Sequence, residues 1–396
     1  MRVMAVCHDS VGIGHIRRTM AIAERATQAI PSCRVLVVSG EAHTPFFALP
    51  ERVDYVKVPS ICKGPDYRYT AKSLGVSFQD ALRIRSAILT ATTASYRPDV
   101  FLIDKSPLGV QGEAESALRL VRDRSPNSRV IFGMRDIEDA PERTINEWRK
   151  GRHLDALKHL VDEIWVYGSR NVFDVVEAYQ LPDAISEKIR YMGYIARRSC
   201  QHTSCSAGRG ASERRLLVTV GGGTDGYRLI DQYLSSPVVS ANGYSVQTTI
   251  VGGPDLPRPQ AEKLRARAAE YPSIQFEDFV PCMDCAYKES DAILCMGGYN
   301  TMVEVVKSGK PMLVYPRVEP RLEQYIRARR FNNLHYCRLL DPNCMTPATI
   351  QAAVQDILAN GNGTPTKEID LDGLTAVASR LSELEASLRD EMAVFV

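Results

Sequence analysis

Residues 214–226 read RRLLVTVGGGTDG, an apolar run of strand length that ends in three consecutive glycines. Consecutive glycines let the backbone turn sharply and present several peptide N–H groups to one point, which suits a diphosphate. The loop lacks the Lys-Ser/Thr pair of a P-loop, so hydrolysis of a nucleoside triphosphate is not indicated. The segment therefore predicts a nucleotide-binding α/β domain, with a purely structural turn as the alternative.

The alternation of apolar strands and segments of helical length continues on both sides of this loop. Strands that are apolar on both faces are typical of a parallel sheet covered by helices on each side. The predicted strands span residues 2–7, 34–39, 53–58, 99–103, 129–132, 163–167, 189–192, 214–220, 245–251, 273–276, 291–296 and 311–315. We expect an α/β protein with two doubly wound, Rossmann-like domains that face each other across a cleft.

A polar stretch rich in serine and glycine separates the two series of strands, and it has no hydrophobic periodicity. We therefore expect an N-terminal domain over residues 1–196, a linker over 197–212 and a C-terminal domain over 213–375. Residues 376–396 are predicted to form a C-terminal helix that packs back on the N-terminal domain.

The composition is that of a folded globular protein, with 44% hydrophobic and 24% charged residues among 396. A net charge of +2 gives no reason to expect nucleic-acid binding. The opening apolar run is too short for a signal peptide, and no stretch approaches the roughly 18 apolar residues of a membrane span. We expect a cytoplasmic protein without a transmembrane segment, and the sequence leaves its oligomeric state open.

The ten cysteines are scattered, often inside apolar strands, as Cys7 and Cys295 are. This pattern suits buried, reduced thiols better than a disulfide framework. Cys282 and Cys285 form one Cys-x-x-Cys, but no second pair stands at zinc spacing. The sequence therefore disfavours zinc binding or redox work there, and no metal site is predicted.

The loop HDSVGIGH at residues 8–15 follows the first predicted strand. Because ligands bind at the carboxyl ends of parallel strands, His15 is a candidate proton acceptor with a near-neutral pKa. Asp104, at the end of the fourth strand, is a candidate for orienting that imidazole. A glycine turn with a helix-capping histidine, and an aspartate that caps the next turn, are the alternatives.

Two further loops of the C-terminal half carry polar groups at predicted strand ends. Glycines precede a helix in the segment MGGYNT at residues 296–301, and Glu304 follows in that helix. Its carboxylate either stabilises the helix N-terminus or accepts hydrogen bonds from ribose hydroxyls. Glu323 and Gln324 begin the next helix after a loop with two prolines, where they offer a carboxylate and an amide to a sugar. Taken alone, that pair is ordinary surface chemistry.

In this order, the loops resemble those of the two-domain nucleotide-sugar glycosyltransferases of the GT-B fold, and most closely the N-acetylglucosaminyltransferase family that makes lipid II. The matching motifs are Gly12-Ile13-Gly14-His15, Gly222-Gly223-Thr224-Asp225-Gly226, Gly298-Tyr299-Asn300-Thr301 with Glu304, and Glu323-Gln324. The resemblance implies donor contacts from Gly222, Gly223, Thr224, Val280, Gly297, Gly298, Asn300, Thr301, Glu304, Glu323, Gln324 and Arg197. It also implies an N-terminal acceptor domain and a C-terminal donor domain.

The chain departs from this family where the acceptor would bind. The first loop carries His8-Asp9-Ser10 instead of Gly-Gly-Thr, and residues 61–78 are polar and basic instead of hydrophobic. A lipid-diphosphate acceptor is therefore not carried over. The candidate acceptor-binding residues are Gly14, Tyr67, Arg135, Asp136 and Asp139. The acidity of the last two predicts a small polar acceptor.

The sequence thus predicts an inverting glycosyltransferase that moves N-acetylglucosamine or a related hexose from a UDP-sugar to a small polar acceptor. No cofactor and no metal are expected, because backbone amides and helix N-termini would stabilise the leaving diphosphate. The alternatives are a nucleotide-sugar 2-epimerase or hydrolase of the same fold, and a non-catalytic sensor of nucleotide sugars. UDP as the nucleotide rests on the family resemblance alone.

Overall fold

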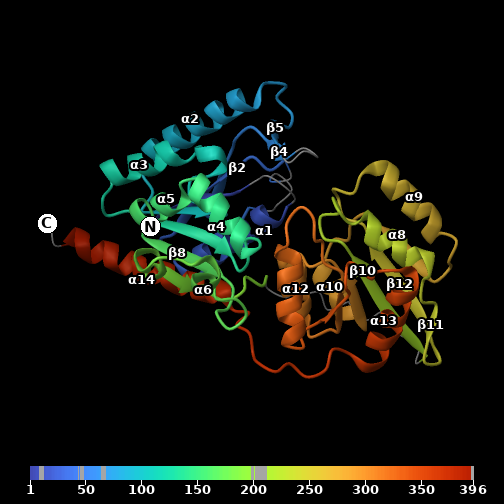
Figure 1. Cartoon of the computed structure of the whole chain (residues 1–396). Coiled ribbons are helices and arrows are strands. Elements are labelled where there is room, and N and C mark those ends of the chain that lie inside the picture. Colours follow the sequence, from blue (N-terminus) through green and yellow to red (C-terminus); the bar gives the residue numbers. More distant parts are fainter. Residues whose placement is uncertain are drawn as a thin grey trace. The chain divides into compact units, whose positions relative to one another are not determined.

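The computed structural model describes residues 1–8, 13–42, 44, 49–63, 68–197, 200 and 212–393. The chain divides into two units, Met1–Ile195 with Asp372–Val396, and Ala196–Leu371 (Figure 1). Each unit contains a largely parallel sheet with helices between most of its successive strands. This architecture confirms the predicted α/β class.

The sheet of the first unit has the strand order β3-β2-β1-β6-β7-β8-β9, and all its neighbouring strands are parallel. Its strands are β1 (Arg2–Val6), β2 (Arg34–Ser39), β3 (Val53–Lys57), β6 (Val100–Asp104), β7 (Arg129–Arg135), β8 (Glu163–Tyr167) and β9 (Ile189–Tyr191). A separate hairpin pairs β4 (Ile61–Lys63) with β5 (Tyr69–Ala71). The sequence did not predict this hairpin, because its strands have only three residues each.

The helices of the first unit are α1 (Gly14–Ala29), α2 (Phe78–Tyr96), α3 (Glu115–Arg124), α4 (Pro141–Lys150), α5 (His153–His159), α6 (Val175–Tyr179), α7 (Asp183–Ser186) and α14 (Gly373–Ala393), with the short 3-10 helix η2 (Val110–Gly112). Helix α14 packs against α1. Glu385 accepts hydrogen bonds from the amino group of Met1 and from the Ser32 hydroxyl, and Arg380 pairs with Glu163 of β8. The end of the chain is therefore part of the first unit.

The sheet of the second unit has the order β11-β12-β10-β14-β15-β16, and β13 pairs with β12 in parallel. Its strands are β10 (Glu213–Thr219), β11 (Ser240–Ala241), β12 (Tyr244–Val251), β13 (Ile274–Glu277), β14 (Ala292–Cys295), β15 (Met312–Val314) and β16 (Arg338–Leu339). Its helices are α8 (Tyr227–Ser235), α9 (Arg258–Ala268), α10 (Met283–Glu289), α11 (Tyr299–Ser308), α12 (Glu323–Asn333) and α13 (Pro347–Asn360). The antiparallel strand β11 and the edge strand β16 were not predicted, because each has only two residues.

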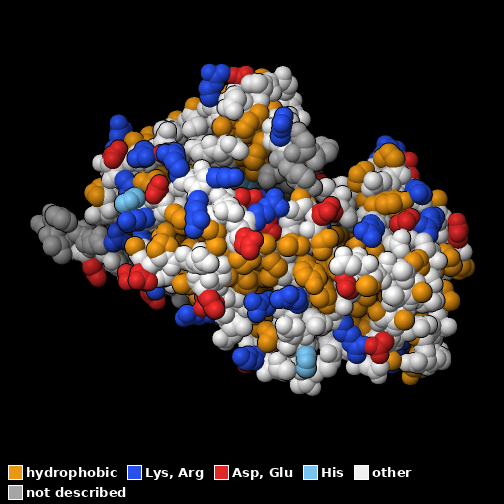
Figure 2. All heavy atoms as spheres, in the orientation of Figure 1, with side chains coloured by type: hydrophobic (Ala, Val, Ile, Leu, Met, Phe, Trp, Pro, Cys, Tyr) orange, Lys and Arg blue, Asp and Glu red, His pale blue; other side chains and the backbone are white. Residues whose placement is uncertain are grey.

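Inner strands of the two large sheets are buried on both faces, as continuous apolar strands require. All five residues of β6 and of β8 are buried, and so are all four of β14. On the face drawn in Figure 2, acidic and basic side chains are interspersed. None of the described helices combines the length and the apolar character needed to cross a bilayer.

Candidate functional site

The first unit places two predicted site residues where its strand order reverses. From β1 the chain continues to β2 and β3 on one side, and then returns to β6 on the other side of β1. Ligands of doubly wound sheets bind at this switch point, outside the carboxyl ends of the strands. Asp104 is the last residue of β6, and His15 is the second residue of α1, just after β1. Gly14 begins that helix.

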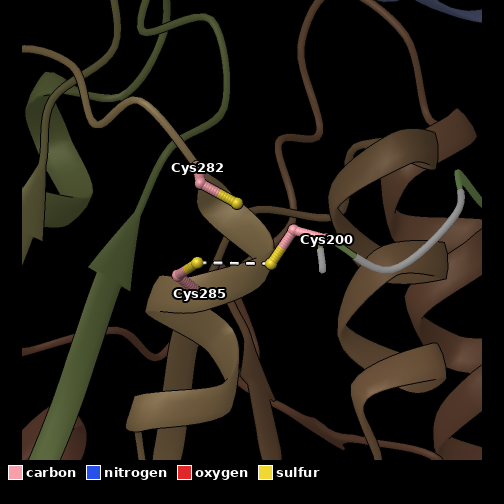
Figure 3. A group of neighbouring side chains, drawn as sticks. All are labelled: Cys200, Cys282 and Cys285. Carbon is pink, nitrogen blue, oxygen red and sulfur yellow. Dashed lines mark hydrogen bonds between the residues drawn. The ribbon is translucent and has the colours of Figure 1, made fainter. Parts of the chain in front are cut away.

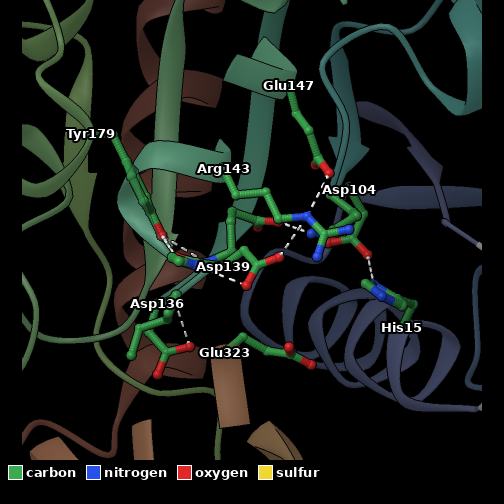
Figure 4. Close-up of polar contacts among 12 residues, drawn as sticks. His15, Asp104, Asp136, Asp139, Arg143, Glu147, Tyr179 and Glu323 are labelled. Carbon is green, nitrogen blue, oxygen red and sulfur yellow. Dashed lines mark hydrogen bonds and ion pairs between the residues drawn. The ribbon is translucent and has the colours of Figure 1, made fainter. Parts of the chain in front are cut away.

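The largely buried His15 and the buried Asp104 form a hydrogen-bonded pair (Figure 4). The distance between His15 Nδ1 and Asp104 Oδ2 is 2.5 Å. Arg18 of α1 donates from Nη2 to the other carboxylate oxygen at 2.6 Å, and its guanidinium lies 5.3 Å from the centroid of the Tyr167 ring. The geometry is that of an imidazole held in one orientation by a carboxylate, which a neighbouring arginine keeps charged.

The electrostatics assign the proton of this pair to the imidazole. Burial alone would raise the pKa of Asp104, but Arg18 and His15 together hold it well below its usual range. The carboxylate therefore accepts, and His15 Nδ1 carries the proton. Nε2, on the opposite edge of the ring, is then the basic nitrogen. Burial, only partly opposed by Asp104, lowers the pKa of His15 to about 4. The near-neutral pKa expected from the sequence is absent because the charged imidazolium would lose its hydration.

The low pKa of His15 gives a testable titration. We expect its imidazole signals in an NMR titration to move with a midpoint near pH 4. Since the unfolded chain has the ordinary histidine pKa of about 6.5, this group lowers the stability of the fold as pH falls from there toward 4. The signals are assigned by their loss in His15→Gln. A midpoint near the ordinary value would contradict the burial.

The loop after β7 is predicted to bind an acceptor, and its acidic side chains are already hydrogen-bonded or ion-paired within the first unit. Asp136 and Asp139 are both buried, and each accepts a hydrogen bond at 2.8 Å from the backbone N–H of the following residue. Arg143 Nε lies 3.4 Å from Asp139 Oδ2, and the Tyr179 hydroxyl accepts from the Glu138 N–H (Figure 4). These contacts explain the two carboxylates as parts of a folded loop, so their acceptor role remains a prediction.

Of three other residues that the sequence predicts in the site, the structure describes two. Arg135 is the last residue of β7 and is half-buried. Tyr67 lies outside the described residues. Arg197, just after the first unit, belongs to the second.

The second unit has its own switch point, between β10 and β14. From β10 the chain continues to β12 and β13 on one side and returns to β14 and β15 on the other. The two predicted glycine-rich turns, residues 221–226 and 296–298, follow these two strands. A Cβ atom at Gly221 would lie 3.5 Å from Thr301 Oγ1. The strand order thus brings together two turns that are 70 residues apart in the chain.

Helices α8 and α11 begin at these turns with glycines at their N-caps. Among the described residues, no side chain caps either helix, at Gly226 or at Gly298. The N-terminal N–H groups of such helices favour anions. Asn300 and Thr301 lie in the first turn of α11 and are half-buried, and Thr224 is exposed. This edge of the sheet therefore offers peptide donors to a phosphate.

The glycines of the two turns have different physical roles. Gly223 has φ +102°, and a Cβ there would lie 2.4 Å from the carbonyl oxygen of Gly252. Gly223 is therefore required by the close approach of the loop after β12. Gly298 has a negative φ of −65°, and nothing lies within 4 Å of a Cβ at that position. Packing thus requires Gly223 but not Gly298.

Arg317, in the loop after β15, joins the glycine turn to the start of α12. It pairs with Asp225 at 3.1 Å and with Glu323, and its backbone N–H donates to Gln324 Oε1 at 3.2 Å. The predicted sugar-binding pair is therefore next to the predicted diphosphate turn. We did not single out Arg317 from the sequence, although its position in a strand-end loop was a usable signal.

Glu304 is paired within the second unit. Arg197 Nε donates to Glu304 Oε1 at 2.7 Å, and the Tyr287 hydroxyl lies 3.5 Å from the other oxygen. Both Glu304 and Arg197 were predicted donor residues, and the structure brings them together. Val280 lies half-buried between β13 and α10.

Two buried arginines escaped the sequence analysis. Arg327 of α12 is fully buried and donates to the carbonyl oxygen of Gly297 at 3.0 Å, so it fixes the turn after β14. Arg18 supports Asp104 in the first unit. Arg18 stands three residues after His15, a spacing that places both on one helix face, and this signal was available. Nothing in the sequence near Arg327 pointed to Gly297.

Two aspartates separated by one residue, a spacing associated with metal-dependent transfer, occur once, at Asp370-Leu371-Asp372. We did not recognise this tripeptide from the sequence. Asp372 forms a β-bridge with Ile195, and its carbonyl oxygen accepts hydrogen bonds from the first turn of α14. The tripeptide therefore lies at the start of a helix and not at the carboxyl end of a strand in either sheet.

These features define a class, namely two-domain α/β proteins with a switch-point site in each sheet. The solved structure of Acinetobacter baumannii MurG shares the fold, with a TM-score of 0.62, 13% identity and coverage of 97% of this chain and all of that one. The UDP-GlcNAc 2-epimerase of Neisseria meningitidis shares it too, with a TM-score of 0.58, 12% identity and coverage of 98% and 100%. The predicted GT-B fold is therefore confirmed.

Residues 217–379 match the glycosyltransferase family 28 C-terminal domain, a stretch that covers most of the second unit and the first residues of α14. The UDP-N-acetylglucosamine–N-acetylmuramyl-(pentapeptide) pyrophosphoryl-undecaprenol N-acetylglucosamine transferase of Streptomyces avermitilis is 26% identical over 200 residues, or 49% of this chain. That match spans 53% of the relative, so the chain spans about half the length of the curated relatives it matches. The predicted resemblance to this transferase family is confirmed.

Proposed function

We propose that this protein is a glycosyltransferase that moves N-acetylglucosamine or a related hexose from a UDP-sugar to a small polar acceptor. The observation that carries the proposal is the pair of glycine-rich turns at the switch point of β10 and β14, inside a family 28 C-terminal domain. UDP-N-acetylglucosamine is the donor in the printed names of the curated relatives. An α/β fold alone would not support an activity, because one fold hosts many functions.

The donor would bind to the second unit. Gly222, Gly223 and Thr224, with the N-terminus of α11, would hold the diphosphate through peptide N–H groups. Arg317, already placed between the two loops, would add a cation near the leaving group. The ribose would compete with Arg197 for Glu304, and the sugar hydroxyls would meet Glu323 and Gln324. With peptide donors and Arg317 in these places, the reaction is proposed to need no metal.

The acceptor would be deprotonated by His15. With the proton of Nδ1 held by Asp104, Nε2 removes the acceptor proton while the acceptor attacks the anomeric carbon. Attack from the face opposite the diphosphate inverts that carbon. A pKa of about 4 keeps the imidazole neutral, and therefore ready to accept a proton, throughout the neutral range. The lipid-linked acceptor named for the relatives is not proposed here, because the first loop departs from theirs.

The decisive experiment measures UDP-, dTDP- and GDP-sugars in a thermal-shift screen and then follows UDP release. We expect UDP-N-acetylglucosamine to raise the melting temperature most, because a ligand that binds only the folded chain stabilises it. UDP release should require an added polar acceptor. Release without acceptor, together with a free sugar, would favour a 2-epimerase or hydrolase. Binding without turnover would favour a sensor.

Two glycine substitutions separate ligand contact from folding. Gly298→Ala adds a methyl group to open space, so we expect an unchanged melting temperature and at least about tenfold weaker UDP-sugar binding, or roughly 1.4 kcal/mol. Gly223→Ala, with its positive φ and close carbonyl, should instead lower the melting temperature. Equal donor affinity in Gly298→Ala and the wild-type protein would move the diphosphate away from α11.

A further inference from the structure

Three cysteines of the second unit converge at the start of α10 (Figure 3). Cys282 and Cys285 form the Cys-x-x-Cys of this segment, and Cys200 arrives from 82 residues earlier in the chain. The three Sγ atoms all lie within 4.8 Å of one another, and those of Cys200 and Cys285 are 3.2 Å apart. All three residues are half-buried.

The spacing of the sulfur atoms suits a single metal ion. With Zn–S bonds of about 2.3 Å and tetrahedral angles, neighbouring thiolates around zinc lie about 3.8 Å apart. The Cys200–Cys285 separation of 3.2 Å is shorter than this value and no pair is more than 4.8 Å apart, so small side-chain rotations would seat three thiolates on one ion. A half-buried site also leaves the fourth position accessible to water, as in three-ligand zinc sites.

Two cations lie near the charge that such a site would carry, and each is also paired with a carboxylate: Lys288 with Asp284 at 2.7 Å and Arg197 with Glu304. Three thiolates and one Zn²⁺ have a net charge of −1. Lys288 Nζ lies 3.8 Å from Cys200 Sγ and also donates to the Cys200 carbonyl oxygen at 3.3 Å. The Arg197 guanidinium interacts electrostatically with Cys282. Asp284 accepts the Cys200 N–H at 2.9 Å, which holds the third cysteine in place.

The other cysteines that the structure describes do not form such a group. Burial raises the pKa of the Cys33 thiol to about 11 and that of Cys295 to about 12, so both stay protonated. Cys344 is exposed, in the same unit. Among the described residues, only Cys200, Cys282 and Cys285 form a group of this kind.

We propose that Cys200, Cys282 and Cys285 bind a zinc ion that fixes Cys200 to helix α10. Binding releases the thiol protons to solvent, and water completes the coordination. The site is structural and separate from the sugar-transfer chemistry. If the chain does not bind zinc, the proposed donor site is not contradicted. The sequence pointed away from zinc because the Cys-x-x-Cys has no second pair, and only the fold supplies the third ligand.

The experiment uses the full chain, reduced and stripped of metal under nitrogen, and titrates it with Co²⁺ and then with Zn²⁺. We expect one Co²⁺ per chain, with the intense near-ultraviolet absorption of thiolate-to-cobalt charge transfer, and its displacement by Zn²⁺. Cys200→Ser and Cys282→Ser should each weaken Co²⁺ binding at least about 100-fold, since loss of outer-shell partners alone costs 10–100-fold. Cys344→Ser, the matched control, should bind as the wild-type chain does.

Melting curves identify any variant that misfolds. The titration of the wild-type chain tests the proposal even then, because it needs no variant. Absence of the charge-transfer absorption in the reduced wild-type chain would overturn the site. Undiminished affinity in a folded Cys200→Ser chain would overturn the role of the third cysteine. A Cys200–Cys285 disulfide that forms in air despite saturating Zn²⁺ would also count against zinc.

Discussion

Replacing His15 with alanine is expected to lower kcat by about 10²–10⁴-fold, the usual contribution of a general base. The imidazole is held by Asp104 through Nδ1, so its loss removes the only group to which we assign the acceptor proton. Donor binding should be unchanged, because the proposed donor contacts belong to the second unit. Steady-state turnover with UDP-N-acetylglucosamine, together with thermal shift by the donor, measures both quantities.

His159→Ala is the matched control, since His159 ends α5 and is exposed. It should retain wild-type turnover. A loss of less than tenfold in His15→Ala would remove His15 from the role of base. Full turnover without any acceptor in the wild-type chain would instead reject the transferase itself, so the two failures are distinguishable.

Replacing Asp104 with asparagine is expected to have the larger effect, because it acts on both chemistry and stability. An amide cannot hold the imidazole proton on Nδ1 as a carboxylate does, and the corresponding change in a catalytic triad costs about 10⁴-fold in kcat. The change also leaves the buried Arg18 without the carboxylate that now lies 2.6 Å away. Breaking a buried ion pair in this way costs about 3–5 kcal/mol of the free energy of unfolding.

Chemical denaturation and kcat measure the two effects separately. Asp123→Asn, at an exposed position of α3, is the control and should change neither. A folded Asp104→Asn chain with near wild-type turnover would show that Asp104 supports only the fold. Partial recovery of stability in the double variant Asp104→Asn, Arg18→Met would identify the uncompensated arginine as the cause.

Most of the fold was predictable because it depends on local patterns. Strands β2 and β8 were predicted to the residue, and the other long strands to within one to three residues at their ends. Apolar runs bounded by turn residues carry this information. The hairpin of β4 and β5 and the short strand β16 were missed, because two or three residues do not establish a period.

The glycine-rich turns were also recognisable from the sequence, but their separate roles were not. Gly223 and Gly298 look alike in the chain. Only the structure distinguishes the glycine packed against the Gly252 carbonyl from the one that faces open space.

The sequence by itself determined the α/β class, the existence of strand-end loops and the residue types they carry, because these follow from hydrophobic period and from glycine. The tertiary structure alone decided which loops meet. His15 and Asp104 are 89 residues apart and Cys200 is 85 residues from Cys285, and strand order and helix packing bring them together. The tertiary structure also decided the pKa of His15. Burial of its imidazole away from water depends on the whole fold and not on the neighbouring residues in the chain.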